Sequence, residues 1–351
     1  MAARSMSRYG ANARAAAGAD GLTATATHDT KRGEDARARL LALSEIADEW
    51  AAAVAQWRAG NARFIRRLGA RRSPSAAHED MLYQALLGVW PVDGDRAGLR
   101  ERFQGYARKA AREGKVETSW LDPDEPYEQG LAAFIDGILA DRSFTARFDA
   151  LAQRVALLGA LNGLTQLALK VGMPGIPDFY QGTEFCDLAL VDPDNRRAVD
   201  FAARERQLGQ GADQVAWRGL VQSWRDGRIK LVLARRLLAW RRDMSQVLSR
   251  GDYRPLTVSG PHRGHVVAFA RVLGDEAAIL VAGRHFTPFT EGGRKWPEAA
   301  AWQAEVVLDG ALDGFALAER ATPNVRAVAL ADIFDPVPVA TLRAIRAPVL
   351  G

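Results

Sequence analysis

The sequence predicts a mixed α/β chain in which strands and helices first alternate and short antiparallel strands follow. Thr23, Thr25 and Thr27 stand at alternate positions, which suits a short pleated strand. A long helical pattern follows at Glu34, and beyond Gly251 the sequence changes to short alternating runs separated by Gly, Pro and Asp turns. A strand that ends in ionisable side chains and leads into a helix is typical of the catalytic edge of a βα barrel.

The composition is that of a globular protein with a large core, because 48% of its 351 residues are hydrophobic. Its 47 basic and 42 acidic residues leave a net charge of +5 with no concentrated basic face, so we expect no nucleic-acid partner. Cys186 is the only cysteine, which excludes an intrachain disulfide and favours a cytoplasmic location. No apolar run approaches the roughly 20 residues of a membrane span, so we expect no membrane association. Residues 1–20 are expected to be a flexible lead-in.

Helical patterns dominate the first half of the chain. Residues 34–59 carry apolar side chains at spacings of three and four, which predicts one amphipathic helix. Residues 60–114 predict further helices, with breaks at Ser73–Pro74 and at Pro91–Gly94. This stretch is too long for an ordinary barrel connection, so we interpret it as a helical insertion.

The second half alternates between loops, helices and strands. Residues 115–127 contain two prolines and four acids, which predicts a structured loop. Two helices are expected within residues 130–172, and a third over residues 230–242. Between them, residues 173–180 predict a short strand, punctuated by prolines, of the kind found in parallel barrels. Residues 246–351 are expected to form a small antiparallel β domain.

Three long motifs occur in a fixed order along the chain. They are Thr23–Arg32, which ends in THDTKR, residues 115–127 (KVETSWLDPDEPY), and residues 174–184 (PGIPDFYQGTE), with residues 190–197 (LVDPDNRR) close behind. Together they resemble the signatures of malto-oligosyltrehalose synthases, a branch of the α-amylase superfamily. The resemblance runs from about Thr23 to the C-terminus. It implies that residues 21–245 are the C-terminal part of a (β/α)8 TIM barrel, namely its last two βα units and a helical insertion.

The resemblance implies an intramolecular transglucosylase of the isomerase class that acts in trehalose biosynthesis. Such an enzyme, a (1→4)-α-D-glucan 1-α-D-glucosylmutase, converts the reducing-end α-1,4 bond of a malto-oligosaccharide into an α,α-1,1 bond. The retaining route uses a carboxylate nucleophile and a second carboxyl group as acid and base. It requires no metal and no organic cofactor.

The resemblance also implies site residues in the first and third motifs and in residues 190–197. Asp29 corresponds to the third acid, which stabilises the oxocarbenium-like transition state, and His28 to its sugar-binding neighbour. Other residues are expected to line the glucan site, namely Lys31, Arg32, Tyr180 and Glu184, with Asp192 and Arg197 as further candidates. From the residues alone, two alternatives stay open. Asp29 or Thr30 could merely cap the next helix, and the loop 188–201 could be a surface ion-pair cluster.

Trp120, which lies in the loop 115–127, also allows two interpretations. It could stack on the apolar face of a pyranose ring, or it could pack under its own loop.

The other two carboxyl groups of the reaction are expected upstream of Thr23. In the superfamily they follow the fourth and fifth strands, and only about twenty residues precede the motif here. Glu34, Asp122 and Glu125 have no setting that identifies a replacement pair. We therefore expect a missing N-terminal barrel segment as a partner, and poor solubility for the chain alone. The alternative is a non-catalytic remnant or a glucan-binding module.

Overall fold

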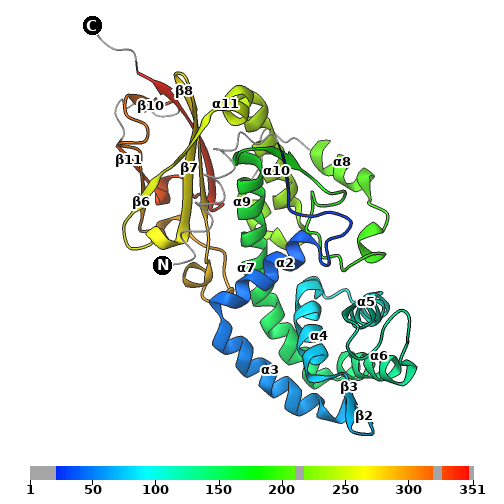
Figure 1. Ribbon diagram of the computed structural model, residues 1–351. Helices are drawn as coiled ribbons and strands as arrows, with labels where there is room; N and C mark the ends of the chain where they lie inside the picture. Colours follow the sequence, from blue (N-terminus) through cyan, green and yellow to red (C-terminus); the bar gives the residue numbers. More distant parts are fainter. Residues whose placement is uncertain (1–20, 210–216, 319–325, 348–351) are drawn as a thin grey trace. The chain divides into compact units, whose positions relative to one another are not determined.

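The computed structural model describes residues 21–209, 217–318 and 326–347, and the chain divides into two compact units (Figure 1). The helical unit comprises residues 28–160 and 187–198, and the described residues of the sheet unit are 21–27, 161–186, 199–209, 217–318 and 326–347. One long helix, α7 (Arg142–Gly172), contributes to both units. The expected lead-in of residues 1–20 lies outside the described residues, and the expected boundary at residue 246 stays a prediction.

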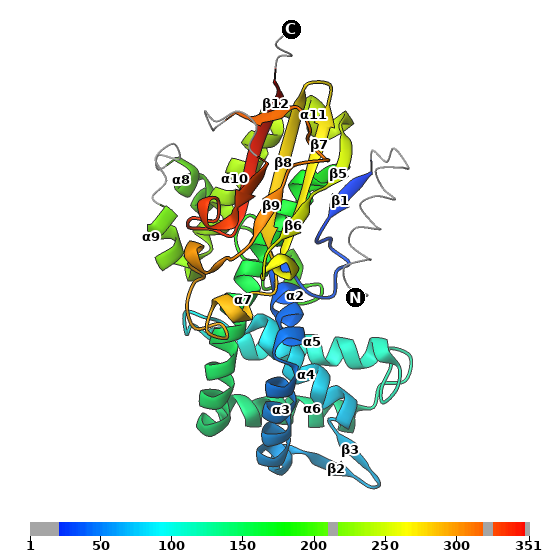
Figure 2. The ribbon, with the colours of Figure 1, turned by 90° about the vertical axis from the view of Figure 1, so that its left-hand side faces the viewer.

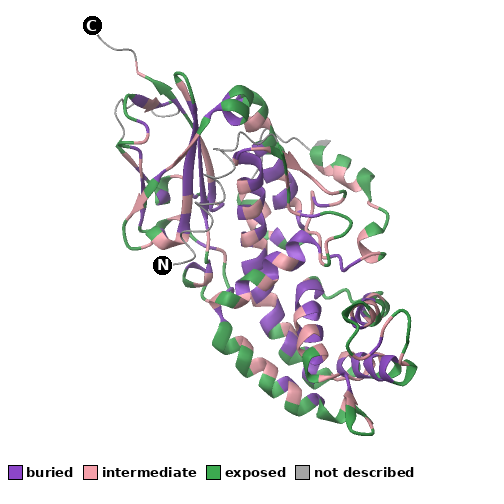
Figure 3. Cartoon of the chain, in the orientation of Figure 1, coloured by how far each residue is buried: buried purple, intermediate pink, exposed green. Residues whose placement is uncertain are grey.

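The helical unit is built from short helices and one hairpin. Its elements are α2 (Glu34–Leu41), η1 (Ala42–Glu45), α3 (Ala47–Asn61), η2 (Ala62–Phe64), β2 (Arg66–Leu68), β3 (Arg71–Ser73), α4 (Ala76–Val89), α5 (Leu99–Gly114), α6 (Glu125–Ala140), the first part of α7, and η3 (Asp194–Arg196). An aromatic core joins α3, α4 and α7, because the Trp57 ring lies 4.9 Å from that of Phe148 and 5.5 Å from that of Tyr83. The outer side of α3 is exposed, as Figure 3 shows.

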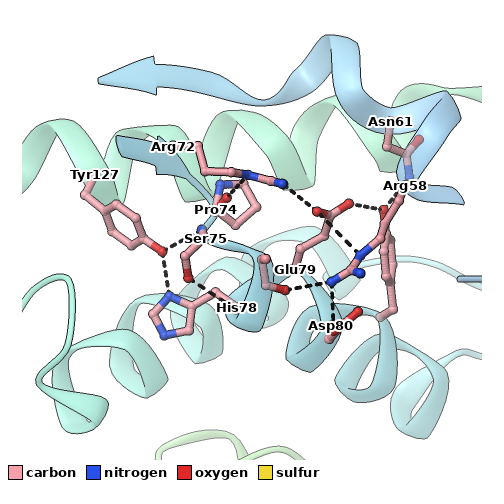
Figure 4. A network of polar contacts seen from close by, with 11 residues as sticks. Arg58, Asn61, Arg72, Pro74, Ser75, His78, Glu79, Asp80 and Tyr127 are labelled. Atoms are coloured by element: carbon pink, nitrogen blue, oxygen red, sulfur yellow. Dashed lines mark hydrogen bonds and ion pairs between the residues drawn. The ribbon is translucent and has the colours of Figure 1, made fainter. Parts of the chain in front are cut away.

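A polar network holds the hairpin against α3, α4 and α6 (Figure 4). The Glu79 carboxylate, which is 1% exposed, accepts hydrogen bonds from Arg72 and from the Tyr83 hydroxyl. The Tyr127 hydroxyl lies 2.6 Å from Nδ1 of His78, and burial lowers the pKa of this histidine. The buried Glu79 carboxylate and the Tyr127 hydroxyl thus both have hydrogen-bond partners, which accounts for these polar groups in the interior.

The predicted helix over residues 34–59 is wrong in one respect, since it is broken in the middle. The Ser44 hydroxyl donates 2.8 Å to the Leu41 carbonyl, and Ile46 leaves the helical region at φ −132°. A hydroxyl that bonds a nearby carbonyl competes with the helical ladder. The predicted breaks at Ser73–Pro74 and Pro91–Gly94 are confirmed, because α4 begins at Ala76 and ends at Val89. The hairpin β2–β3 was not predicted.

The sheet unit contains a parallel strand pair and two antiparallel sheets. The parallel pair is β1 (Leu22–Ala24) and β4 (Ile176–Asp178), with Leu22 opposite Ile176. A strand was predicted in each of these two regions, but the register was not. The antiparallel strands are β5 (Asp252–Pro255), β6 (Thr257–Ser259), β7 (Val266–Leu273), β8 (Glu276–Gly283), β9 (Glu305–Val307), β10 (Phe315–Leu317), β11 (Ala327–Ala329) and β12 (Val339–Arg346). They form a five-stranded sheet in the order β10-β12-β8-β7-β5 and a three-stranded sheet in the order β11-β9-β6 (Figure 2).

Among the described residues, the sheet unit contains four further helices besides the second part of α7. They are α8 (Phe201–Gly209), α9 (Trp217–Gln222), α10 (Arg228–Asp243) and α11 (Ser245–Arg250), with the single turns η5 (Trp224–Asp226), η6 (Arg263–His265), η7 (Thr287–Phe289), η8 (Ala299–Ala301) and η9 (Leu330–Asp332). The helix predicted over residues 230–242 is confirmed as α10. The strand β12 was missed because its apolar residues Val339, Leu342 and Ile345 recur every three positions, which is not the strand period.

The helix α7 is long and apolar enough, by length and composition, to cross a membrane. This corrects the expectation that no segment would approach that length. Of its most apolar window, 78% is buried inside the protein. Burial of that extent indicates a core helix, which agrees with its nearly continuous apolar surface.

Candidate functional site

The segment His28–Arg32 is held in place by the loop 187–198 of the same unit. The Asn195 side chain donates to the His28 carbonyl at 2.7 Å, and the Gly33 amide donates to the Ala189 carbonyl at 2.7 Å. A Cβ on Gly33 would lie 2.5 Å from the Asp187 carbonyl oxygen, so only glycine fits this close approach. Two motifs far apart in the sequence therefore form one structure.

His28 and Asp29 present their side chains to solvent. Nε2 of His28 lies 3.3 Å from a carboxylate oxygen of Asp29, and the side chains are 59% and 83% exposed. The helix α2 begins at Glu34 with Gly33 as its N-cap residue, so the alternative that Asp29 or Thr30 caps this helix is wrong. The Asp29 carboxylate is thus placed where a ligand can reach it.

Lys31 belongs to a chain of alternating charges that continues along α5. Its ammonium donates to Glu113 at 2.9 Å, and Lys109 lies 3.7 Å from Glu113 and 2.6 Å from the Asp192 carboxylate. The hydrogen bond from Lys109 lowers the pKa of Asp192. The hydrogen bond that Lys31 donates to Glu113 raises the pKa of Lys31. Asp192 therefore acts here as the partner of a lysine.

Arg32 contacts the buried face of the same helix. Its guanidinium donates to the Tyr106 hydroxyl at 3.0 Å and lies 5.9 Å from the centre of that ring. Burial raises the pKa of Tyr106, so this phenol is a neutral partner for the cation. This contact anchors the end of the His28–Arg32 segment to α5.

Arg197 is paired with a buried carboxylate. Its Nε lies 3.0 Å from Asp194, which is 8% exposed and also accepts two hydrogen bonds from Arg102, at 2.7 and 2.9 Å. The Leu190 amide completes the set at 2.7 Å. The alternative of an ion-pair cluster in the loop 188–201 is therefore correct as a description of its contacts, although Asp194 at its centre is buried.

Tyr180 and Glu184 lie in the sheet unit, in the turn that follows β4. The Tyr180 carbonyl accepts from the Thr183 hydroxyl at 2.7 Å, and Glu184 accepts from Nε of Arg204 at 2.9 Å. Arg204 also donates to the Gly182 carbonyl, which closes the turn. The expectation that these residues share a pocket with Asp29 stays a prediction.

The contact residues that were not predicted include Tyr106, Lys109, Glu113 and Asn195. Only the spacing of Lys109 and Glu113, four residues apart on a helix, was a signal that the sequence offered. The other contacts join positions 74 and 167 residues apart, which no local pattern reveals. In the described parts of the chain, no group of three or more His, Cys, Asp or Glu could hold a metal ion.

Comparison with known proteins gives a consistent set of relatives. The chain is 36% identical over 267 residues to a putative maltooligosyl trehalose synthase of Mycobacterium tuberculosis, which covers 76% of this chain and 31% of the relative. The solved maltooligosyltrehalose synthase of Arthrobacter ramosus matches 97% of this chain and 40% of its own, with a TM-score of 0.73 and 30% identity. A hypothetical maltooligosyl trehalose synthase of Sulfolobus tokodaii matches 79% of this chain and 35% of its own, with a TM-score of 0.65 and 30% identity.

A scan of protein-family models gives no match. The chain spans about a third of the length of the curated relatives that it matches.

Proposed function

We propose that this chain, which belongs to the maltooligosyltrehalose synthase family, supplies one part of the active site of such an enzyme. The proposed reaction moves the reducing-end glucose of a malto-oligosaccharide from an α-1,4 to an α,α-1,1 bond. The exposed pair His28 and Asp29, held by the loop 187–198, is the observation that carries this proposal.

Asp29 is proposed as the acid that stabilises the transition state. A retaining glycosidase passes through an oxocarbenium-like ring, and a carboxylate beside that ring lowers its energy electrostatically. His28 stands 3.3 Å from this carboxylate, close enough for both to bond hydroxyls of one sugar. Lys31 and Arg32 would border the site, while Asp192 and Arg197 would act indirectly by holding its loop.

The nucleophile and the acid/base are proposed to come from the part of the longer relatives that this chain does not match. The parallel pair β1–β4 supports this division. Its apolar partners Leu22 and Ile176 are 63% and 52% exposed, whereas parallel sheets ordinarily have both faces covered. We infer that further barrel strands pack here, so that β1 and β4 become the last two strands of a (β/α)8 barrel.

The proposed setting is a cytoplasmic one with a soluble glucan as the partner. The single Cys186, which is partly exposed, is compatible with a reducing compartment.

The test is reconstitution of the reaction from two pieces. The purified chain is incubated with maltopentaose, alone and together with a separately produced N-terminal segment of a longer relative. We expect loss of reducing ends without release of glucose only in the mixture. Conversion by the chain alone would contradict the proposed division of the site, and a mixture that co-elutes but leaves maltopentaose unchanged would contradict the proposed function.

A further inference from the structure

The loop between α5 and α6 presents large apolar side chains to solvent. Trp120 is 55% exposed, Leu121 is 100% exposed and Val116 is 80% exposed. The alternative that Trp120 packs under its own loop is therefore wrong. Exposed large apolar side chains that gather in one place commonly mark a binding site, so this loop is a candidate for binding a ligand.

The loop has a fixed conformation. The Ser119 amide donates to the Asp122 carbonyl at 3.1 Å, and the Asp122 amide donates to the Ser119 hydroxyl at 2.9 Å. The Thr118 hydroxyl accepts from the Asp124 amide at 2.9 Å and donates to Glu128 at 2.8 Å. These bonds define the path of the chain on both sides of Trp120.

The indole itself rests on a cation that cannot move freely. The Arg112 guanidinium lies 4.9 Å from the centre of the Trp120 ring. Two hydrogen bonds, at 2.7 and 2.8 Å, tie this guanidinium to Glu128, which is 8% exposed. The ring is thus held on one side and reachable by solvent elsewhere, so little ordering is required when a ligand binds.

The loop lies at the same end of α5 as the candidate site. Arg112 and Glu113 are consecutive residues in the last turn of this helix, and Glu113 accepts the hydrogen bond from Lys31. One of the two therefore contacts Trp120 while the other contacts the segment that carries Asp29. All of these residues belong to the helical unit.

We propose that Trp120 is a stacking platform for a glucosyl unit of an α-1,4-glucan, beyond the units that Asp29 and His28 contact. The apolar face of a pyranose presents C–H groups that pack well on an indole. Ser119 and Asp122 flank Trp120 in the same loop, and their side chains carry polar groups of the kind that bond sugar hydroxyls. The choice of glucan as the ligand rests on the proposed function.

The experiment compares the binding of maltoheptaose and maltotriose to the chain by isothermal titration calorimetry. Trp120→Ala should weaken maltoheptaose binding by about threefold to tenfold, the range expected for loss of one ring contact. Trp120→Phe should retain part of the affinity. Leu121→Ala is the matched control, since this side chain is fully exposed in the same loop, and its affinity should equal that of the original chain. The urea midpoint of Leu121→Ala should equal that of the original chain because this side chain is fully exposed, and the midpoints of the Trp120 variants should change only by the loss of the contact with Arg112.

Three results would overturn the proposal. One is that the original chain does not bind maltoheptaose. Another is that Trp120→Ala binds maltoheptaose as tightly as the original chain. The last is that Leu121→Ala loses as much affinity as Trp120→Ala, which would indicate a general apolar face in place of a stacking site.

This test is separable from that of the proposed function because it needs no reaction. If reconstitution fails while Trp120→Ala still weakens maltoheptaose binding, the stacking site stands and the synthase function falls. If reconstitution succeeds and Trp120→Ala binds maltoheptaose as tightly as the original chain, the synthase function stands and the stacking site falls.

Discussion

Most of the charged side chains that the sequence predicts to bind glucan form ion pairs in the structure. Lys31 contacts Glu113, Asp192 contacts Lys109, and Arg197 contacts Asp194. Asp29 is paired with His28 at 3.3 Å, and its side chain is 83% exposed, compared with 67% for Lys31 and 56% for Arg197. The structure therefore adds which of these side chains are paired, while their assignment to a glucan site stays a prediction.

Asp194 is the residue on which the loop 187–198 depends. Its carboxylate, 8% exposed, accepts from Arg102 and from the Leu190 amide. The Arg102 side chain is 24% exposed, so removing the carboxylate leaves a partly buried cation without its partner, and Asp194→Asn should lower the free energy of unfolding at neutral pH by about 2 kcal/mol. Urea denaturation checks this, with Asp122→Asn, a change at an exposed carboxylate, as the control. An unchanged midpoint for Asp194→Asn would contradict the buried pair.

The same pair has a defined pH dependence. Burial opposes ionisation of Asp194, but the hydrogen bonds from Arg102 and Leu190 outweigh it and keep its pKa below the ordinary value of 3.8. The native state therefore binds fewer protons than the unfolded state, so the stabilisation is complete above about pH 4 and is lost as the pH falls through the depressed pKa. The difference in unfolding free energy between the original chain and Asp194→Asn should narrow below that pH. A constant difference would contradict this assignment.

At the scale of elements, close packing of helices decides which glycines can be replaced by alanine without loss of stability. A Cβ on Gly159 of α7 would lie 2.8 Å from Cα of Arg39 in α2, whereas a Cβ on Gly105 of α5 meets no atom within 4 Å. Alanine is the better helix former, so Gly105→Ala should stabilise by about 0.5–1 kcal/mol. Gly159→Ala should destabilise by about 2 kcal/mol, because the backbone of α2 must shift. Thermal unfolding of the two variants checks this, and a shift of the same sign in both would refute the packing of α2 on α7.

Elements with a strong local signal were predictable from the sequence. The helix α10 and the breaks around α4 follow from apolar spacing and from proline. The break at Ser44 and the strand β12 were missed, the first because one hydroxyl decides it and the second because β12 is defined by its pairing with β8. Tertiary contacts override local preference at such positions.

At the scale of the whole molecule, the parallel pair β1–β4 is the feature whose strands the local sequence patterns predicted best. It is also the feature that most requires a further segment to cover its exposed side chains. The motifs that flank it were found from the sequence, as was the presence of a strand that ends before His28, but the register of the pair was not. What could not be predicted is the set of contacts across long separations, such as Lys109 with Asp192, 83 residues apart.

The exposed apolar residues of this pair should cause self-association of the chain. Leu22 and Ile176 face each other across the two strands and are 63% and 52% exposed. Sedimentation velocity should detect concentration-dependent association of the chain, reduced by Leu22→Lys and by addition of the N-terminal segment. Leu273→Lys, at a residue that is 38% exposed at the end of β7, is the control and should leave association unchanged. A monodisperse monomer that unfolds cooperatively would contradict this expectation.

The most direct measurement is the rate of maltopentaose conversion by the reconstituted mixture when the chain carries Asp29→Asn. Asp48→Asn, at an exposed residue in the first turn of α3, is the matched control. Removal of a group that stabilises developing charge costs on the order of a hundredfold or more in rate. We predict that loss for Asp29→Asn together with an unchanged rate for Asp48→Asn. Equal rates for both variants would contradict the central claim that Asp29 is this chain's contribution to catalysis.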